Sequence, residues 1–186
     1  MENELANLTK RLSNQSFRVA VSEEELQKRV RELANEISLE YASSPALVLI
    51  SVMKGAFIFT ADLVRHLRVP LNIDFLKVSS YVDTKSTGNV KLEFSPSVDW
   101  EGKDVLIIED IVDTGRTMDF LYDFLGSKKP KSLKICALFV RQGARTNSRV
   151  GFFGFPLKSD AFIVGYGLDY NQRYRELPCV VELLGP

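Results

Sequence analysis

Hydrophobic and polar positions follow two different periods along the chain, and these periods predict helices and strands in turn. From residue 22 to 41, a Ser-Glu-Glu-Glu start precedes apolar residues spaced three and four apart, which is typical of a capped amphipathic helix. Segments 56–67 and 118–125 carry similar apolar stripes. Continuous apolar runs at 46–52, 105–108 and 133–140 predict strands buried on both faces of a parallel sheet, and a further strand is expected at 71–79.

The order of these elements favours an α/β fold. Strand, helix, strand, strand, helix, strand is the order expected when helices cross back over a twisted, mainly parallel sheet. Residues 81–89 are polar and turn-rich, so we expect a mobile loop there between two extended arms. Residues 151–186 alternate aromatics with glycines and prolines, and predict short strands and turns over the main sheet.

Composition narrows the class of protein. The chain has 186 residues, enough for one domain with a sizeable core, and its 24 basic and 24 acidic residues cancel. We therefore expect no nucleic-acid partner and no membrane partner. Cys136 and Cys179 lack metal-site spacing and fit a reduced, cytoplasmic protein. His66 is the only histidine and falls at a predicted helix end. Having one histidine excludes multi-histidine metal sites, and the position of His66 argues against a catalytic histidine triad.

An acidic cluster follows the strand predicted at 105–108. Glu109 and Asp110 can accept hydrogen bonds from a vicinal diol, and residues 113–117, Asp-Thr-Gly-Arg-Thr, offer backbone N–H groups, hydroxyls and a cation to a phosphate. The helix expected next adds the partial positive charge of its N-terminus. Carboxyl ends of strands are where open α/β sheets bind ligands, so the cluster predicts a site for a phosphorylated sugar.

Other residues with suitable chemistry follow predicted strands as well. Lys54 and Gly55 stand between the first buried strand and its helix, and Arg141 ends the strand at 133–140. Near the C-terminus, Phe162 offers a ring face to a heterocycle and Asp169 offers a hard oxygen to Mg²⁺. A diphosphate leaving group needs cationic and N–H donors, which the Lys-Gly turn can supply.

The stretch Glu-Asp-Ile-Val-Asp-Thr-Gly at 109–115 resembles the phosphoribosyl pyrophosphate signature of type I phosphoribosyltransferases. Three further motifs are in register: Met-Lys-Gly at 53–55 before an Ala-Asp-Leu helix, Ser-Tyr at 80–81 with Ser-Thr-Gly at 86–88, and Val-Gly-Tyr-Gly-Leu-Asp-Tyr-Asn at 164–171 with Arg175. Together they resemble the hypoxanthine-guanine phosphoribosyltransferase family from about residue 26 to 183. The resemblance implies the type I fold, with one domain over 1–186, a core at about 22–150 and a hood from about 1–21 and 151–186.

The resemblance also implies an activity. Such an enzyme joins a 6-oxopurine, hypoxanthine or guanine, to phosphoribosyl pyrophosphate with Mg²⁺, giving IMP or GMP and pyrophosphate in purine salvage. It would work in the cytoplasm as a homodimer or homotetramer. The main alternative is a regulator that binds phosphoribosyl pyrophosphate on the same fold, for which the neutral charge offers no nucleic-acid face. No GxxxxGK[ST] motif occurs, which disfavours a P-loop protein.

Residue roles carry over by position. Glu109 and Asp110 would hold the ribose hydroxyls and take part in metal binding. Asp113 would lie beside the 5′-phosphate and would also face purine N7, as the general base or as the partner of the proton that leaves the ring. Phe162 would stack on the purine, backbone groups of Ile163 and Asp169 would read its edge, and Asp169 would bind Mg²⁺. Ser80 and Tyr81 would belong to a closing lid. The remaining phosphoribosyl pyrophosphate contacts would come from Thr114, Gly115, Arg116, Thr117, Lys54, Gly55 and Arg175, with a cis peptide at Met53-Lys54.

Arg141 stands where the family usually has a lysine that donates to the purine 6-oxo group. A guanidinium can still donate, but its planar fork is larger than an ammonium. A 6-oxopurine substrate is therefore expected, and the preference among hypoxanthine, guanine and xanthine is left open.

Overall fold

A computed structural model describes residue 12 and residues 16–83, 86–144, 149–158 and 161–184, with residues 79–90 described by their backbone alone. The main sheet has the strand order β4-β3-β2-β5-β6-β7. Its strands β2, β3, β5, β6 and β7 pair in parallel, and β4 pairs antiparallel with β3. The bounds are β2 Leu47–Met53, β3 Leu71–Asp83, β4 Ser86–Phe94, β5 Asp104–Val112, β6 Ser132–Arg141 and β7 Val150–Leu157.

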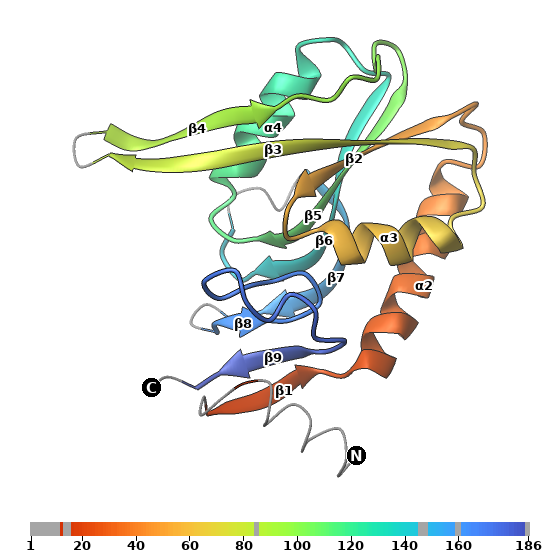
Figure 1. Ribbon diagram of the computed structural model, residues 1–186. Helices are drawn as coiled ribbons and strands as arrows, with labels where there is room; N and C mark the ends of the chain where they lie inside the picture. The colour runs from red at the N-terminus through yellow and green to blue at the C-terminus, as the bar shows by residue number, and fades with distance from the viewer. Residues whose placement is uncertain (1–11, 13–15, 84–85, 145–148, 159–160, 185–186) are drawn as a thin grey trace.

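Helices cover both faces of this sheet (Figure 1). Helices α2 (Glu23–Glu40) and α3 (Phe57–His66) lie on one face, and α4 (Arg116–Gly126) lies on the other. Strand residues alternate accordingly: Leu47 and Leu49 of β2 pack in the core beneath α2 and α3, whereas Val48 and Ile50 pack in the core beneath α4. Both faces are buried, which explains why these strands read as continuous apolar runs.

The α/β prediction is confirmed. The runs at 46–52, 105–108 and 133–140 lie within or beside β2, β5 and β6, and the striped segments form α2, α3 and α4. The capping box is also present. Ser22 Oγ accepts from the backbone N–H of Glu25 at 3.3 Å, and Glu25 Oε2 accepts from the backbone N–H of Ser22 at 2.9 Å.

The structure differs from the sequence expectation in the stretch 81–89. Strands β3 and β4 pair as far as Asp83 and Ser86, so most of the expected loop is a hairpin ladder. Pairing satisfies backbone N–H and C=O groups that a loop would leave to water, and it outweighs the polar composition. Residues 84 and 85, which join the strands, lie outside the described residues.

A second difference concerns β7. Residues 151–157 were expected in the segment that lies over the sheet, but β7 pairs in parallel with β6 and extends the main sheet. Its buried Phe152 and Leu157 pack into the core beneath α2, so burial of apolar side chains favours this place.

A second sheet is separate from the main sheet, and we call it, together with the turns between β8 and β9, the hood. Strands β1 (Phe17–Val21), β9 (Val180–Leu183) and β8 (Ile163–Val164) pair antiparallel in the order β1-β9-β8. Figure 1 places this sheet beyond the β7 edge of the main sheet. The hood has a small core of its own, which includes Leu12, Val164, Leu177 and Val181. The expected N-terminal part of the hood at 1–11 and 13–15 lies outside the described residues.

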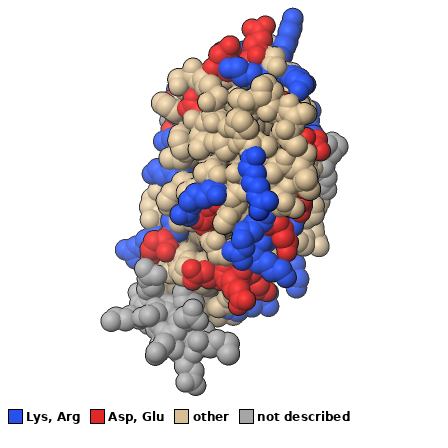
Figure 2. All heavy atoms as spheres, turned by 90° about the vertical axis from the view of Figure 1, so that its right-hand side faces the viewer, with Lys and Arg blue, Asp and Glu red and all other residues tan. Residues whose placement is uncertain are grey.

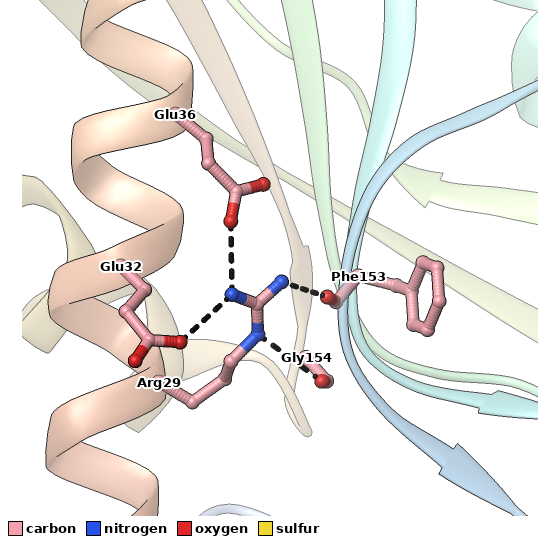
Figure 3. Close-up of polar contacts among 5 residues, drawn as sticks. All are labelled: Arg29, Glu32, Glu36, Phe153 and Gly154. Carbon is pink, nitrogen blue, oxygen red and sulfur yellow. Dashed lines mark hydrogen bonds and ion pairs between the residues drawn. The ribbon is translucent and has the colours of Figure 1, made fainter.

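One arginine ties α2 to the edge strand (Figure 3). Arg29 donates to the backbone carbonyl oxygens of Phe153 at 2.8 Å and Gly154 at 3.2 Å, and to the carboxylates of Glu32 and Glu36. Strand β7 approaches β6 closely at Gly154, where an added Cβ would lie 2.5 Å from the carbonyl oxygen of Leu138.

The α2 face carries interspersed basic and acidic side chains (Figure 2). It therefore presents no extended field of one sign.

Trp100 packs in the core beneath α4. Its side chain is 1% exposed, and its Nε1 donates to the carbonyl oxygen of Leu125 at 2.9 Å, in the last turn of that helix. Its ring contacts Phe124, and Lys128 Nζ lies 4.3 Å from its centroid. Among the helices of the described chain, none is long and apolar enough to cross a membrane.

Candidate active site

The predicted site residues from the core converge at the carboxyl edge of the main sheet. Strand β5 lies between β2 and β6 and runs parallel to both, so the ends of all three strands face the same way. Lys54 follows β2, Glu109 and Asp110 lie near the end of β5, and Arg141 ends β6. These residues therefore lie at one edge of the sheet, as the order of strands and polar residues in the sequence predicts.

The acid pair of β5 packs against the β2–α3 turn. Glu109 is 7% exposed, and its Oε1 accepts from the backbone N–H of Asp110 at 3.1 Å. Asp110 Oδ1 accepts from the backbone N–H of Ile111 at 2.8 Å, and a Cβ added to Gly55 would lie 1.5 Å from Asp110 Oδ2. Burial and the nearby Asp110 charge raise the pKa of Glu109 well above its usual range. Gly55 is therefore required for the carboxylate of Asp110 to lie where it does.

The turn after β5 leads directly into the start of helix α4. Gly115 is the N-cap of α4 with φ +86°, a left-handed conformation that glycine adopts without strain, and α4 begins at Arg116. As the N-cap, Gly115 provides no side-chain acceptor for the first N–H groups of the helix. The N–H of Arg116 has a long contact of 3.5 Å to Thr114 Oγ1. Such a helix start favours negative charge through its dipole and its N–H donors.

Arg141 brings the β5–α4 turn and the hood together. Its Nε donates to Asp113 Oδ1 at 2.5 Å, and its Nη1 donates to the carbonyl oxygens of Lys158 at 2.8 Å and Ala161 at 3.1 Å. The side chain of Asp113 is 56% exposed, so one of the two partners faces solvent. The structure thus places Asp113, the predicted catalytic residue, directly against Arg141, the residue that departs from the pattern of the family the sequence resembles.

A tight turn of the hood carries Asp169 and Arg175. Asp169 Oδ1 pairs with Arg175 Nη2 at 2.8 Å, and Asp169 Oδ2 accepts from the backbone N–H of Gln172 at 2.8 Å. Arg175 Nη1 also donates to the carbonyl oxygen of Gly167 at 2.7 Å. A Cβ added to Gly167 would lie 2.0 Å from the carbonyl oxygen of Gly55, so this turn rests on the Lys54-Gly55 loop.

Gln172 is a site residue that the sequence argument missed. Lys54 Nζ donates to Gln172 Oε1 at 3.3 Å, and Gln172 therefore joins the core loop to the hood turn. Its φ of +64° marks a turn position. The available signal was Asp169 three residues earlier, because aspartate side chains commonly accept from backbone N–H groups just downstream.

The aromatic face of the site belongs to the hood. Phe162 is 49% exposed, and Tyr170 meets its ring edge-on, with centroids 5.7 Å apart and planes at 86°. Ile163 is buried and pairs with Glu182 of β9. The peptide bond Met53-Lys54 is cis, as the resemblance implied.

The predicted lid residues and the predicted metal ligands remain to be placed. Ser80 and Tyr81 lie in β3, paired with Val90 and Asn89, but their side chains are outside the described part of the chain. Within the described residues, no three acidic, histidine or cysteine side chains cluster as a metal cage. Glu109, Asp110 and Asp169 therefore do not form such a cage together.

The comparisons with known proteins agree with this arrangement. A model of the phosphoribosyl transferase domain matches residues 22–171. The chain is 45% identical over 165 residues to hypoxanthine-guanine phosphoribosyltransferase of Bacillus subtilis, covering 88% of this chain and 91% of that protein. It is 43% identical over 169 residues to hypoxanthine phosphoribosyltransferase of Salmonella typhimurium, covering 89% and 94%.

Solved structures give the same result. A crystal structure of a hypoxanthine-guanine phosphoribosyltransferase from Bacillus anthracis matches with a TM-score of 0.84 at 40% identity, covering 90% of this chain and 98% of that chain. The hypoxanthine phosphoribosyltransferase of Trypanosoma cruzi matches with a TM-score of 0.81 at 39% identity, covering 89% and 95%. With these similarities over most of its length, the chain belongs to the phosphoribosyltransferase family and groups within it with the hypoxanthine and hypoxanthine-guanine phosphoribosyltransferases.

Proposed function

We propose that this protein transfers the 5-phosphoribosyl group from phosphoribosyl pyrophosphate to hypoxanthine or guanine, giving IMP or GMP and pyrophosphate in purine salvage. The observation that carries the proposal is the convergence at one sheet edge of an acid pair, a helix start and a lysine loop. The hood adds an exposed aromatic ring, Phe162. Each feature matches one part of the two substrates, and the family relationship supports their combination.

The ribose and its phosphate are assigned to β5 and the turn that follows. Asp110, with Glu109 behind it, accepts hydrogen bonds from the ribose hydroxyls, and the N–H groups of residues 113–117 surround the 5′-phosphate. Thr114 and Thr117 add hydroxyls, and Arg116 adds a cation. Because the N–H donors are fixed by the helix start, they need no reorganisation when the anion binds.

The purine is assigned to the space between Phe162 and Arg141. The exposed ring of Phe162 stacks on the base, and backbone groups of Ile163 and Asp169 read its edge. Arg141 donates to the 6-oxo group, and Asp113 accepts the proton that leaves N7 as the new bond forms. The Asp113–Arg141 contact supports this pairing, because it places the proton acceptor and the 6-oxo donor side by side.

The pyrophosphate is assigned to Lys54, Gly55 and Arg175. Gly55 packs against Gly167, whose carbonyl oxygen accepts from Arg175, so these residues bring two cations and backbone donors to one region. Mg²⁺ is usually held by one or two carboxylates together with substrate phosphates, and Asp169, with Glu109 and Asp110 toward the ribose, fits such a site. When bound, Mg²⁺ neutralises charge on the leaving pyrophosphate.

Three further features complete the proposal. The β3–β4 hairpin with Ser80 and Tyr81 closes over the site and excludes water, which would otherwise hydrolyse the activated sugar. We also infer that the protein works in the cytoplasm and assembles as a homodimer or homotetramer. Sedimentation of the purified chain would measure its assembly.

The deciding experiment measures nucleotide formation from each free base. The purified protein is incubated with phosphoribosyl pyrophosphate, Mg²⁺ and hypoxanthine, guanine, xanthine or adenine, and the monophosphate is quantified. We expect IMP and GMP, and little AMP. Binding of phosphoribosyl pyrophosphate with no nucleotide formed from any base would refute the enzyme and favour the regulator.

A further inference from the structure

Asp62 of α3 lies buried where α2, α3 and the hood meet. Its Oδ2 accepts from the Tyr166 hydroxyl at 2.6 Å and from Gln27 Nε2 at 2.8 Å, and its Oδ1 accepts from Arg65. Asp62 is 9% exposed and Tyr166 is 2% exposed. A buried carboxylate is costly unless donors surround it, and here three elements contribute them. No role in the proposed reaction has been assigned to either residue above.

Tyr166 belongs to a backbone turn of unusual conformation. Gly165, Tyr166 and Gly167 have φ values of +100°, +51° and +103°, so all three residues are left-handed. A tyrosine adopts this region only where its surroundings hold it there. The Tyr166 N–H donates to the carbonyl oxygen of Leu177 at 2.9 Å, and the Gly167 N–H donates to that of Arg175 at 2.9 Å. The turn is therefore a fixed body within the hood.

This turn separates the two groups proposed to hold pyrophosphate. On one side, Gly167 packs against the carbonyl oxygen of Gly55, with no room for a Cβ. On the other side, the carbonyl oxygen of Gly167 accepts from Arg175, which pairs with Asp169. A shift of the turn would therefore change the distance from the Lys54-Gly55 loop to Asp169 and Arg175 together.

Helix α3 is the element that connects the turn to the core loop. It begins at Phe57, two residues after Gly55, and Thr60 Oγ1 shares a buried 2.7 Å hydrogen bond with Ser51 Oγ of β2. Asp62 follows two residues later. One end of the connection is thus anchored in β2, and the other is the hydrogen bond from Tyr166.

We propose that Asp62 is a positioning residue. Its hydrogen bond from Tyr166 sets the distance between the Lys54-Gly55 loop and the turn at 165–169, and the pyrophosphate group binds between these two segments. This inference rests on the proposed function. A hydrogen bond to a charged acceptor is stronger than one between neutral groups. Burial, together with the Asp62 charge, raises the pKa of Tyr166 far above its usual range, so the phenol remains a donor.

The variant Tyr166→Phe tests the hydrogen bond alone. The ring is kept, and Asp62 retains its donors Gln27 and Arg65, so the carboxylate is not left unpaired. We expect KM for phosphoribosyl pyrophosphate to rise by about tenfold while kcat changes by less than about threefold. Asp62→Asn, which keeps an acceptor of the same size but loses the charge, should raise KM in the same direction.

Tyr41→Phe is the matched control. Tyr41 is a buried tyrosine that is 4% exposed and caps the C-terminal end of α2, beside the strand starts and so at the opposite edge of the sheet. Its loss of a hydroxyl should leave KM unchanged. A second readout is independent of activity: the amides of residues 165–167 should exchange hydrogen faster in Tyr166→Phe than in the wild type or in Tyr41→Phe.

These experiments distinguish failure of the proposed function from failure of the positioning role. If the wild type forms no nucleotide, the proposed function fails. If the wild type is active and Tyr166→Phe keeps its KM and its amide exchange, the positioning role is overturned, even where the melting temperature falls. A raised KM with faster exchange confined to the turn supports the proposal.

Discussion

Gly55→Ala is the substitution whose effect the geometry specifies most closely. The added Cβ would lie 1.5 Å from Oδ2 and 2.3 Å from Cγ of Asp110. Both atoms belong to a side chain, so the backbone can stay in place while the Asp110 carboxylate rotates away. In doing so it loses the 2.8 Å hydrogen bond from the backbone N–H of Ile111. The substitution therefore displaces one carboxylate and leaves the fold intact.

The expected magnitudes differ sharply between stability and activity. The lost backbone hydrogen bond costs about 0.5–1.5 kcal/mol, and replacing glycine in a compatible conformation recovers about 0.4–1 kcal/mol. The melting temperature should therefore move by no more than about 4 °C. Losing a charge-assisted contact to the ribose costs about 1.5–3 kcal/mol, which lowers kcat/KM for phosphoribosyl pyrophosphate by roughly 10- to 150-fold.

The assay compares three proteins. Steady-state rates of IMP formation are measured against phosphoribosyl pyrophosphate concentration for the wild type, Gly55→Ala and Gly126→Ala. Gly126 is the matched control, because a Cβ there would meet only Leu133 Cδ2 at 4.0 Å, an ordinary contact in the last residue of α4. We expect Gly126→Ala to keep wild-type kinetics.

A double-mutant cycle identifies the cause. If Gly55→Ala acts by displacing the Asp110 carboxylate, adding it to Asp110→Ala should cost little more than Asp110→Ala alone. Full additivity of the two losses would refute that route. An unchanged kcat/KM in Gly55→Ala would refute the assignment of Asp110 to the ribose, provided that Asp110→Ala is also unimpaired.

Three further expectations follow from the described contacts. Asp113→Asn should lower kcat by about 10²–10⁴-fold with little change in phosphoribosyl pyrophosphate affinity, and a variant with more than half of wild-type turnover would contradict its role. Arg141→Met should lose most activity with hypoxanthine, while the wild type should reject adenine by about 10⁴-fold; comparable use of both bases would remove the assignment. Burial raises the pKa of Asp104, but hydrogen bonds from Ser132, Ser44 and Lys131 outweigh it and hold the pKa below the ordinary value of an aspartate. Its stabilising contribution is therefore complete above the pKa of the unfolded chain and is lost as the pH falls through the folded pKa, so the difference in unfolding free energy between wild type and Asp104→Asn should shrink below about pH 4.

The buried strands were predictable because short continuous apolar runs are typical of strands that are covered on both faces. Strands such as β5 are covered on both faces, and the polar residues after them must lie at a sheet edge. The positions of Glu109, Asp110, Lys54 and Arg141 at this edge therefore follow from the sequence pattern alone. The helix at 23–40 was equally clear, because Ser22 and its apolar spacing give independent signals.

The features that the sequence did not predict depend on pairing between distant segments, and local hydrophobic patterns do not encode such pairing. The polar stretch 81–89 is mostly strand because two arms pair across it, and β7 joins the main sheet because β6 offers it an edge. Contacts between distant segments were hidden for the same reason. The Lys54–Gln172 and Asp62–Tyr166 hydrogen bonds join residues more than a hundred positions apart.

Trp100 gives the protein a built-in optical probe. It is the only tryptophan of the chain, and its indole is held against the last turn of α4. The first turn of that helix is the proposed phosphate-binding end. Fluorescence excited selectively at tryptophan wavelengths therefore arises from a single ring at the far end of α4. Its emission should report how that helix is seated during unfolding and titration, without an attached dye.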